Sequence, residues 1–155
     1  MVQYPGQEPI MDGKENNHLN LEDLEKQYPL CFKHKGCCMY GVEIQPGWNK
    51  IIHVLLARLE DHLTLNPDKF INCEFPFRID QIKEKFGTLR FYVSGAASDE
   101  MMMDIDDAEV QSANTCEVCA KRGVVHVSKG GFWLKTLCSE CAKDEYIPYN
   151  RNMMP

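Results

Sequence analysis

The sequence predicts an α+β protein, in which one main helix packs on a small antiparallel sheet and a cysteine-rich module follows near the C-terminus. Apolar residues recur at steps of three and four over residues 48–63, which is typical of an amphipathic helix. Apolar and polar residues alternate in two runs over residues 75–93, which is typical of strands. The chain divides into an arm (1–20), a core (21–93), an acidic linker or helix (94–115), a cysteine module (116–142) and a tail (143–155).

A short helix is expected after the N-terminal arm. The arm contains glycine and proline breaks and no hydrophobic period, so we expect loosely held chain there. Leucines then recur at helical spacing, with Asn20 as the expected N-cap and Pro29 as the residue that ends the helix. Residues 31–47 are expected to form an irregular connector because glycine and proline interrupt them.

The clearest helix begins at Trp48 and ends at Asn66-Pro67. Its apolar stripe is formed by seven residues: Trp48, Ile51, Ile52, Leu55, Leu56, Leu59 and Leu63. His53 and His62 lie largely off this stripe, so they are interpreted as solvated positions rather than ligands.

Two strands joined by a turn near Gly87 are expected next. The first contains Phe75, Phe77 and Ile79, and the second contains Leu89, Phe91 and Val93. Residues 82–86 either extend the first strand or form one helical turn, and periodicity alone does not decide between them.

Residues 94–115 change in composition. Residues 94–98 are small and predict a linker, and Ile105, Ala108 and Val110 suggest a short amphipathic helix. From Asp99 to Glu109 there are six acidic residues and no basic one, a pattern that usually marks a solvated face.

Four of the eight cysteines have the spacing of a metal site. Cys116 and Cys119 form one C-x2-C pair, and Cys138 and Cys141 form another after eighteen intervening residues. Each two-residue gap lets both thiolates point at one ion, and two such pairs complete the tetrahedral sulfur shell that suits zinc. The alternatives are a redox dithiol or four unrelated core cysteines. A site closed by four cysteines is structural, because catalytic zinc keeps one position open.

The remaining cysteines are less informative. A second metal site at Cys31, His34, Cys37 and Cys38 is an open alternative to partly buried free thiols, and Cys73 stands alone. Between the two cysteine pairs, apolar residues flank Lys129-Gly130-Gly131, which predicts a β-hairpin. The polar tail is expected to fray.

Composition excludes several classes of protein. Of 155 residues, 44% are hydrophobic and 26% are charged, which is ordinary for a globular chain. No apolar run approaches the length of a membrane span, and the N-terminus has no secretory signal, so the expected location is a reducing cytoplasm. The formal net charge of −6 has the wrong sign for a protein that coats nucleic acid.

Several motifs in order carry a resemblance to a known family. Gly47-Trp48 opens the main helix, residues 81–92 read QIKEKFGTLRFY, and the two cysteine pairs follow, the second preceded by Trp133, Thr136 and Leu137. Over roughly residues 38–142 the chain resembles small, mostly uncharacterised zinc-ribbon proteins of bacteriophages and prophages. The resemblance implies a phage origin, a host-cell cytoplasmic location and a zinc ribbon, for which a treble-clef-like module is the alternative. It implies no activity. The turn formed by each C-x2-C pair is called a knuckle, and Ala120 departs from the glycine expected in the first knuckle.

The cysteine module also distantly resembles zinc-supported HNH-type endonucleases. Those enzymes need a histidine base and further ligands for a divalent metal. His126 is the only histidine in the predicted hairpin, no Asp-His pair precedes it, and Ala142 stands where that group often has asparagine. We therefore expect no enzymatic activity, with a degenerate nuclease as the third hypothesis.

The first functional hypothesis is a non-enzymatic protein that binds and inhibits a host protein, such as a component of a defence system. Methionines make adaptable apolar contacts, and an acidic run can mimic phosphates. The candidate partner-binding residues are Met101, Met102, Met103, Asp104, Asp106 and Asp107.

The alternative is a small zinc-ribbon regulator that binds nucleic acid. Basic residues interleaved with aromatic ones pair with phosphates and stack on bases. The candidate residues are Lys83, Lys85, Arg90, Tyr92, Lys121, Arg122 and Lys135. The overall acidity of the chain opposes this alternative.

Overall fold

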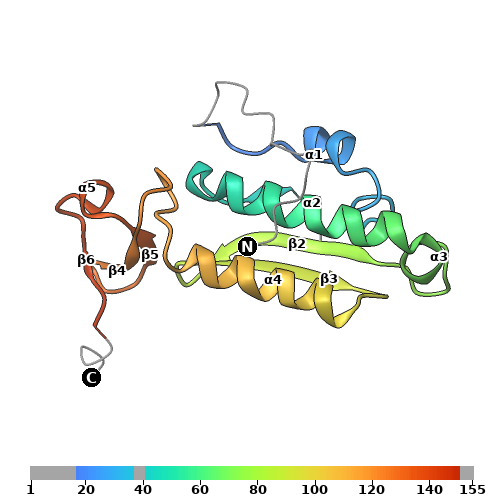
Figure 1. Cartoon of the computed structure of the whole chain (residues 1–155). Helices are drawn as coiled ribbons and strands as arrows, with labels where there is room; N and C mark the ends of the chain where they lie inside the picture. Colours follow the sequence, from blue (N-terminus) through green and yellow to red (C-terminus); the bar gives the residue numbers. More distant parts are fainter. Residues whose placement is uncertain (1–16, 37–40, 151–155) are drawn as a thin grey trace.

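A computed structural model describes residues 17–36 and 41–150. The predicted α+β class is confirmed, with two small sheets, helices over the first sheet and a cysteine module at one end of the molecule (Figure 1). The elements in chain order are α1 (Leu21–Gln27), β1 (Val42–Glu43), the 3-10 turn η1 (Pro46–Trp48), α2 (Asn49–Leu65), α3 (Pro67–Phe70), β2 (Arg78–Lys85), β3 (Thr88–Ser94), α4 (Asp99–Ser112), β4 (Val124–Ser128), β5 (Leu134–Leu137), α5 (Ser139–Ala142) and β6 (Tyr146–Pro148).

The first sheet has the strand order β1-β2-β3. The predicted hairpin is confirmed as the antiparallel pair β2 and β3, and residues 82–85 extend the first strand. The sheet is nevertheless mixed rather than antiparallel, because β1 pairs with β2 in parallel. This strand could not be predicted, since its two residues come from the irregular connector. Phe75 lies outside the strand and is exposed.

The turn between β2 and β3 consists of Phe86 and Gly87, both with positive φ (55° and 79°). Two positive φ values are characteristic of a type I′ turn, a two-residue hairpin turn whose twist matches that of the flanking strands. Glycine adopts this conformation freely, whereas a phenylalanine is strained there.

Helices α2 and α4 cover the same face of this sheet (Figure 1). The predicted stripe of α2 is buried throughout. His53 and His62 are half-buried rather than solvated: His53 Nδ1 lies 2.9 Å from the Tyr28 hydroxyl, and His62 Nε2 lies 3.1 Å from Asp104 Oδ2. Burial lowers the pKa of His53.

The segment predicted as an acidic linker or short amphipathic helix forms a helix of fourteen residues that packs on the core. Met101, Ile105 and Ala108 of α4 are buried, while Val110 is exposed. The same helix covers the edge of β3: Ser112 Oγ accepts from Leu89 N (2.8 Å), and a Glu109 carboxylate oxygen accepts from Phe91 N (3.0 Å). Unpaired edge N–H groups are thereby satisfied.

The N-terminal helix follows its prediction closely. Asn20 caps α1, its side chain accepting from Glu22 N and Asp23 N. The described part of the arm is held rather than loose, because Asn49 donates to the carbonyl of Asn17 and His18 Nδ1 lies 3.2 Å from the carbonyl of Ile44. The earlier part of the predicted arm lies outside the described residues.

The second sheet has the order β5-β4-β6 and forms the cysteine module with α5. The hairpin of β4 and β5 is confirmed. The start of the predicted tail, however, forms a third strand, β6, which pairs antiparallel with β4. Tyr146 packs against the buried cysteine cluster, so this strand is held by the small core of the module.

Backbone contacts attach the module to the main core. Gly47 N donates to Glu117 O (2.7 Å), and Trp48 Nε1 donates to Thr115 O (2.9 Å). A methyl group at Gly47 would overlap the backbone of Cys116 and Glu117, so only glycine permits this approach. A further contact joins β5 to the β2–β3 turn, where Thr136 Oγ1 donates to Gly87 O (2.5 Å). None of the helices in the described ranges is long and apolar enough to cross a membrane.

Candidate metal centre

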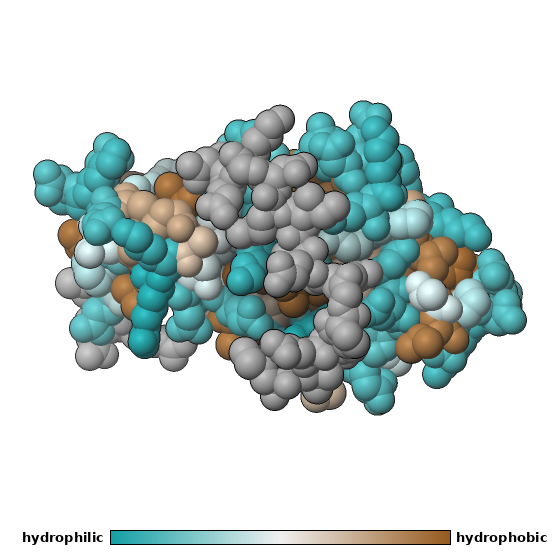
Figure 2. All heavy atoms as spheres, turned by 45° about the horizontal axis from the view of Figure 1, so that its top comes forward, coloured by the Kyte–Doolittle hydropathy of each residue, from teal (hydrophilic) through white to brown (hydrophobic). Residues whose placement is uncertain are grey.

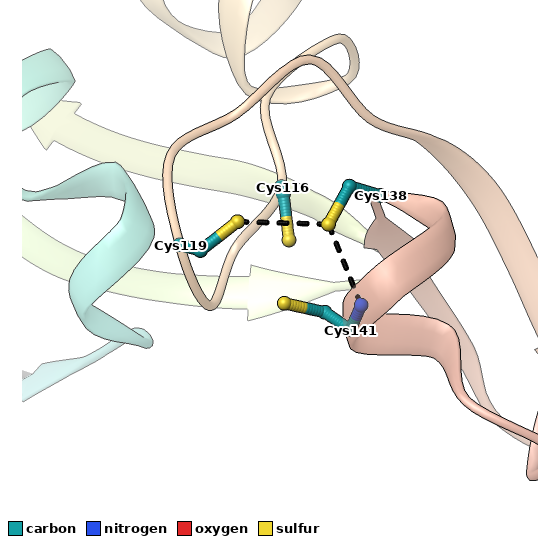
Figure 3. Close-up of side chains that lie close together, drawn as sticks. All are labelled: Cys116, Cys119, Cys138 and Cys141. Carbon is teal, nitrogen blue, oxygen red and sulfur yellow. Dashed lines mark hydrogen bonds between the residues drawn. The ribbon is translucent and has the colours of Figure 1, made fainter.

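The structure brings together the four cysteines that the spacing predicted. Cys116 and Cys119 lie in the loop after α4, and Cys138 and Cys141 lie at the start of α5 and within it. Figure 3 shows their sulfur atoms turned toward one another. All four Sγ atoms lie within 4.8 Å of one another, and those of Cys119 and Cys138 are 3.6 Å apart.

These distances fit a tetrahedral metal ion. With metal–sulfur bonds of about 2.3 Å, as zinc makes, tetrahedral geometry places the sulfur atoms about 3.8 Å apart. Four thiolates fill all four positions, which is the arrangement of a structural ion rather than a catalytic one. The cluster is the one group of potential metal ligands found within residues 17–36 and 41–150.

The first knuckle turns through hydrogen bonds from Cys116 N to Lys121 O (2.7 Å) and from Ala120 N to Cys116 O (3.0 Å). Ala120 has a φ of 67°, the left-handed conformation for which the sequence pattern expected glycine. The knuckle therefore adopts a left-handed turn with an alanine and carries the strain of an alanine at this position.

The second pair is placed by the N-terminus of a helical turn. Cys138 is the N-cap residue of α5, and its Sγ accepts from Cys141 N at 3.4 Å (Figure 3). This N–H group lowers the pKa of Cys138 to about 7. The three-stranded sheet is consistent with a zinc ribbon, while a helical turn carrying the second pair is the feature shared with the treble-clef-like alternative.

Burial and neighbouring thiols have the opposite effect on two other ligands. Burial, followed by the neighbouring cysteines, raises the pKa of Cys141, and burial is also the largest cause that raises the pKa of Cys119. Several thiolates this close together repel one another, so a bound cation is needed to hold all four as ligands.

Glu117 lies between the two cysteines of the first knuckle and is almost fully buried. Its carboxylate accepts from Lys135 Nζ at 2.8 Å, and its backbone N donates to Thr136 O at 2.9 Å. Burial raises the pKa of Glu117. The first knuckle is thus tied to β5 by a backbone bond and an ion pair.

The candidate nucleic-acid residues do not form one surface. Lys83, Arg90 and Tyr92 lie on the face of the first sheet opposite the helices, where Lys83 pairs with Glu43 on one side and Arg90 on the other. Arg90 also forms an ion pair with Glu109 (3.7 Å). Lys121 and Lys135 form ion pairs in the module, with Glu140 and Glu117 respectively, and Arg122 and Lys85 are exposed.

The candidate partner-binding residues separate into two groups. Met101 was wrongly predicted as a contact residue, because its side chain is fully buried between α4 and the core. Asp104 is engaged by Arg58 (3.4 Å) and His62. Four of the six predicted residues are exposed on the outer face of α4: Met102, Met103, Asp106 and Asp107.

The proposed second metal site lies partly outside the described residues, which exclude Cys37 and Cys38. Cys31 is fully buried, and its thiol lies 3.6 Å from the carbonyl oxygen of Leu56. Burial raises the pKa of this thiol. Cys31 therefore belongs to the core.

His126, the one candidate base of the nuclease hypothesis, is buried in β4. Its Nδ1 lies 2.8 Å from the carbonyl oxygen of Val124. A buried ring bonded to its own strand is the arrangement of a structural histidine.

Sequence reasoning missed a group of exposed aromatic side chains at two hairpin turns. Phe132 and Trp133, at the tip between β4 and β5, are 87% and 72% exposed, and Phe86 is 66% exposed. The signal was present in the sequence, since aromatic residues next to turn glycines are poorly placed for burial. Apolar periodicity instead places Phe132 and Trp133 next to the predicted hairpin turn and leaves residues 82–86 open between a strand and a helical turn.

Comparison with known proteins gives no relative: no family model, no curated protein and no solved structure matches the chain.

Proposed function

We propose that the protein is a phage-encoded, non-enzymatic binding protein that modulates a host protein by stoichiometric contact, and that the ion of its four-cysteine site is zinc. The contact is assigned to the aromatic turn surface, defined as Lys85, Phe86, Lys129, Phe132 and Trp133. The observation that carries the proposal is the exposure of Phe132 and Trp133 on a tip whose backbone is fixed.

The tip is held by Ser128. Its Oγ accepts from Phe132 N (3.3 Å) and Trp133 N (3.2 Å), and its backbone N donates to Trp133 O (2.8 Å). Aromatic side chains on an ordered backbone lose little entropy on binding, and tryptophan is enriched among the residues that dominate interface energies.

Phe86 gives a second, independent argument. It has a φ of 55° and a largely exposed side chain, so it carries the strain of a left-handed conformation without the benefit of burial. Gly87, the next residue, contacts the backbone of Lys135, only two residues from Trp133. The β2–β3 turn therefore lies against β5, the strand that begins directly after the aromatic tip.

The charge of the module favours a protein over nucleic acid as the partner. Residues 113–150 contain five basic and four acidic residues. Four thiolates and one divalent ion add about −2, so the module has no excess of positive charge for phosphates.

The test is capture from host lysate by tagged protein, with and without nuclease, followed by titration of the captured protein in purified form. Phe132→Ser/Trp133→Ser is compared with Leu65→Ser/Phe75→Ser, which alters two equally exposed apolar residues outside the aromatic turn surface. We expect nuclease-resistant binding at a fixed ratio that the first variant loses and the control keeps. Binding that nuclease abolishes, or that both variants keep, would contradict the proposal.

A further inference from the structure

A second exposed apolar surface lies on α4. The methionine stripe, defined as Met102, Met103, Asp106, Asp107 and Val110, occupies the outer side of this helix. Met103 and Val110 are each 64% exposed and Met102 is 41% exposed. Helix α4 is anchored by its opposite side, so the stripe is presented on a fixed element rather than on a loose linker.

The aromatic turn surface and the methionine stripe have opposite charge. Asp106 and Asp107 border the apolar residues of the stripe, and they take part in none of the ion pairs found among the described residues. Lys85 and Lys129 border the aromatic residues at the turns, and they too are absent from those ion pairs. Lys85 Nζ instead lies 5.4 Å from the centroid of the Phe86 ring.

The apolar parts are also complementary. Methionine side chains are flexible and polarisable, and they make favourable sulfur contacts with aromatic rings. Surface hydropathy is uneven: Figure 2 shows hydrophobic residues toward both ends of the visible face, next to hydrophilic ones.

We propose that the protein forms a two-fold dimer in which the aromatic turn surface of each copy docks on the methionine stripe of the other. The methionine stripe lies on α4, whereas the aromatic turn surface lies at the β2–β3 turn and at the tip between β4 and β5, so the two surfaces are formed by different elements and can make two separate contacts. A two-fold arrangement makes the same contact twice and closes the assembly, so both surfaces of each copy are covered.

The dimer is a separate interaction from host binding and, given the proposed function, it regulates host binding. Each aromatic turn surface is covered in the dimer, so a host protein that uses this surface competes with the second copy. Zinc-loaded full-length protein at low concentration is then the form that is competent for binding.

The test is sedimentation of the full-length, metal-loaded protein over a hundredfold range of concentration, at low and high salt. One variant reverses the charge of the methionine stripe (Asp106→Lys/Asp107→Lys), and one reverses the charge of the aromatic turn surface (Lys85→Glu/Lys129→Glu). A third variant combines all four changes. The control, Asp68→Lys/Glu74→Lys, makes the same change of net charge as the stripe variant (+4), at exposed positions in and near α3.

We expect the wild type and the control to dimerise, each single reversal to weaken dimerisation at least about tenfold, and the combined variant to regain it. A monomeric wild type, or a combined variant as weak as the single reversals, would overturn the proposal. Unchanged circular dichroism and metal content show that a variant is folded. The stripe reversal leaves the aromatic turn surface intact, so capture of a host protein by this variant tests the proposed function separately.

Discussion

At the scale of single residues, two of the three non-glycine residues with positive φ in the described chain lie in turns next to the metal site and the exposed aromatic residues, the third being Lys143. Ala120 has a φ of 67° in the first knuckle, and Phe86 has a φ of 55° in the β2–β3 turn. Departures from a local rule tend to be retained where they serve a site. The strained alanine lies in a turn that carries two of the four clustered cysteines, and the strained phenylalanine is exposed in the surface that we propose binds a partner.

Replacement of Ala120 by glycine is expected to stabilise the module by about 1 kcal/mol, because glycine removes the left-handed strain. Ala57→Gly is the matched control, since it lies inside α2 and is expected to cost about 1 kcal/mol. Chemical denaturation of both variants with metal bound measures the difference. A destabilised Ala120→Gly would show that the alanine is not strained.

At the scale of elements, α4 gives the clearest lesson on what sequence can predict. The apolar spacing of Ile105 and Ala108 predicted a helix, and both side chains are buried. The acidic run predicted a solvated face, because composition does not reveal that Asp104 and Glu109 are bound by groups on α2 and β3. Strands β1 and β6 were missed for a similar reason, since two- and three-residue strands are formed by their neighbours and have no period of their own.

Helix α4 also supports β3, which leads to a prediction for Ser112. Its hydroxyl is buried and accepts from Leu89 N, so Ser112→Ala leaves a buried N–H group without a partner. We expect a loss of about 1–3 kcal/mol in the free energy of unfolding. Thr64→Ala, which removes an exposed hydroxyl bonded to Glu60 O on α2, is the control and is expected to change stability by less than about 0.5 kcal/mol. Equal effects of the two changes would contradict the role of α4 as an edge cover.

At the scale of the whole molecule, the cysteine module and the main core are held together by close backbone contacts. The sequence showed both parts and the four ligands, because cysteine spacing and helical period are local signals. It did not show the docking, because Gly47 is separated by about seventy residues from the knuckle it contacts. The exposure of the aromatic turns could not be predicted from local sequence either, because it depends on which side chains the rest of the fold covers.

Gly47→Ala tests the docking of the module. The added methyl group would overlap the backbone of Cys116 and Glu117, so we expect a loss of about 3 kcal/mol and weaker metal binding. Gly130→Ala is the matched control, because its nearest neighbouring atom, Phe132 Cδ2, is 3.7 Å away and its φ is not positive. Denaturation and competition with a chelator measure both effects. A Gly47→Ala protein as stable as Gly130→Ala would mean that the module is not held in this way.

The measurement that tests the account most directly is the metal content of protein purified without added metal, by mass spectrometry of the native protein and by elemental analysis. The four-cysteine site predicts one zinc ion per chain in the wild type and in the control Cys73→Ser, whose thiol lies outside the cluster. It predicts loss of the ion and of the folded module in Cys119→Ser. A wild type without metal, or a Cys119→Ser protein that keeps both metal and fold, would contradict the account.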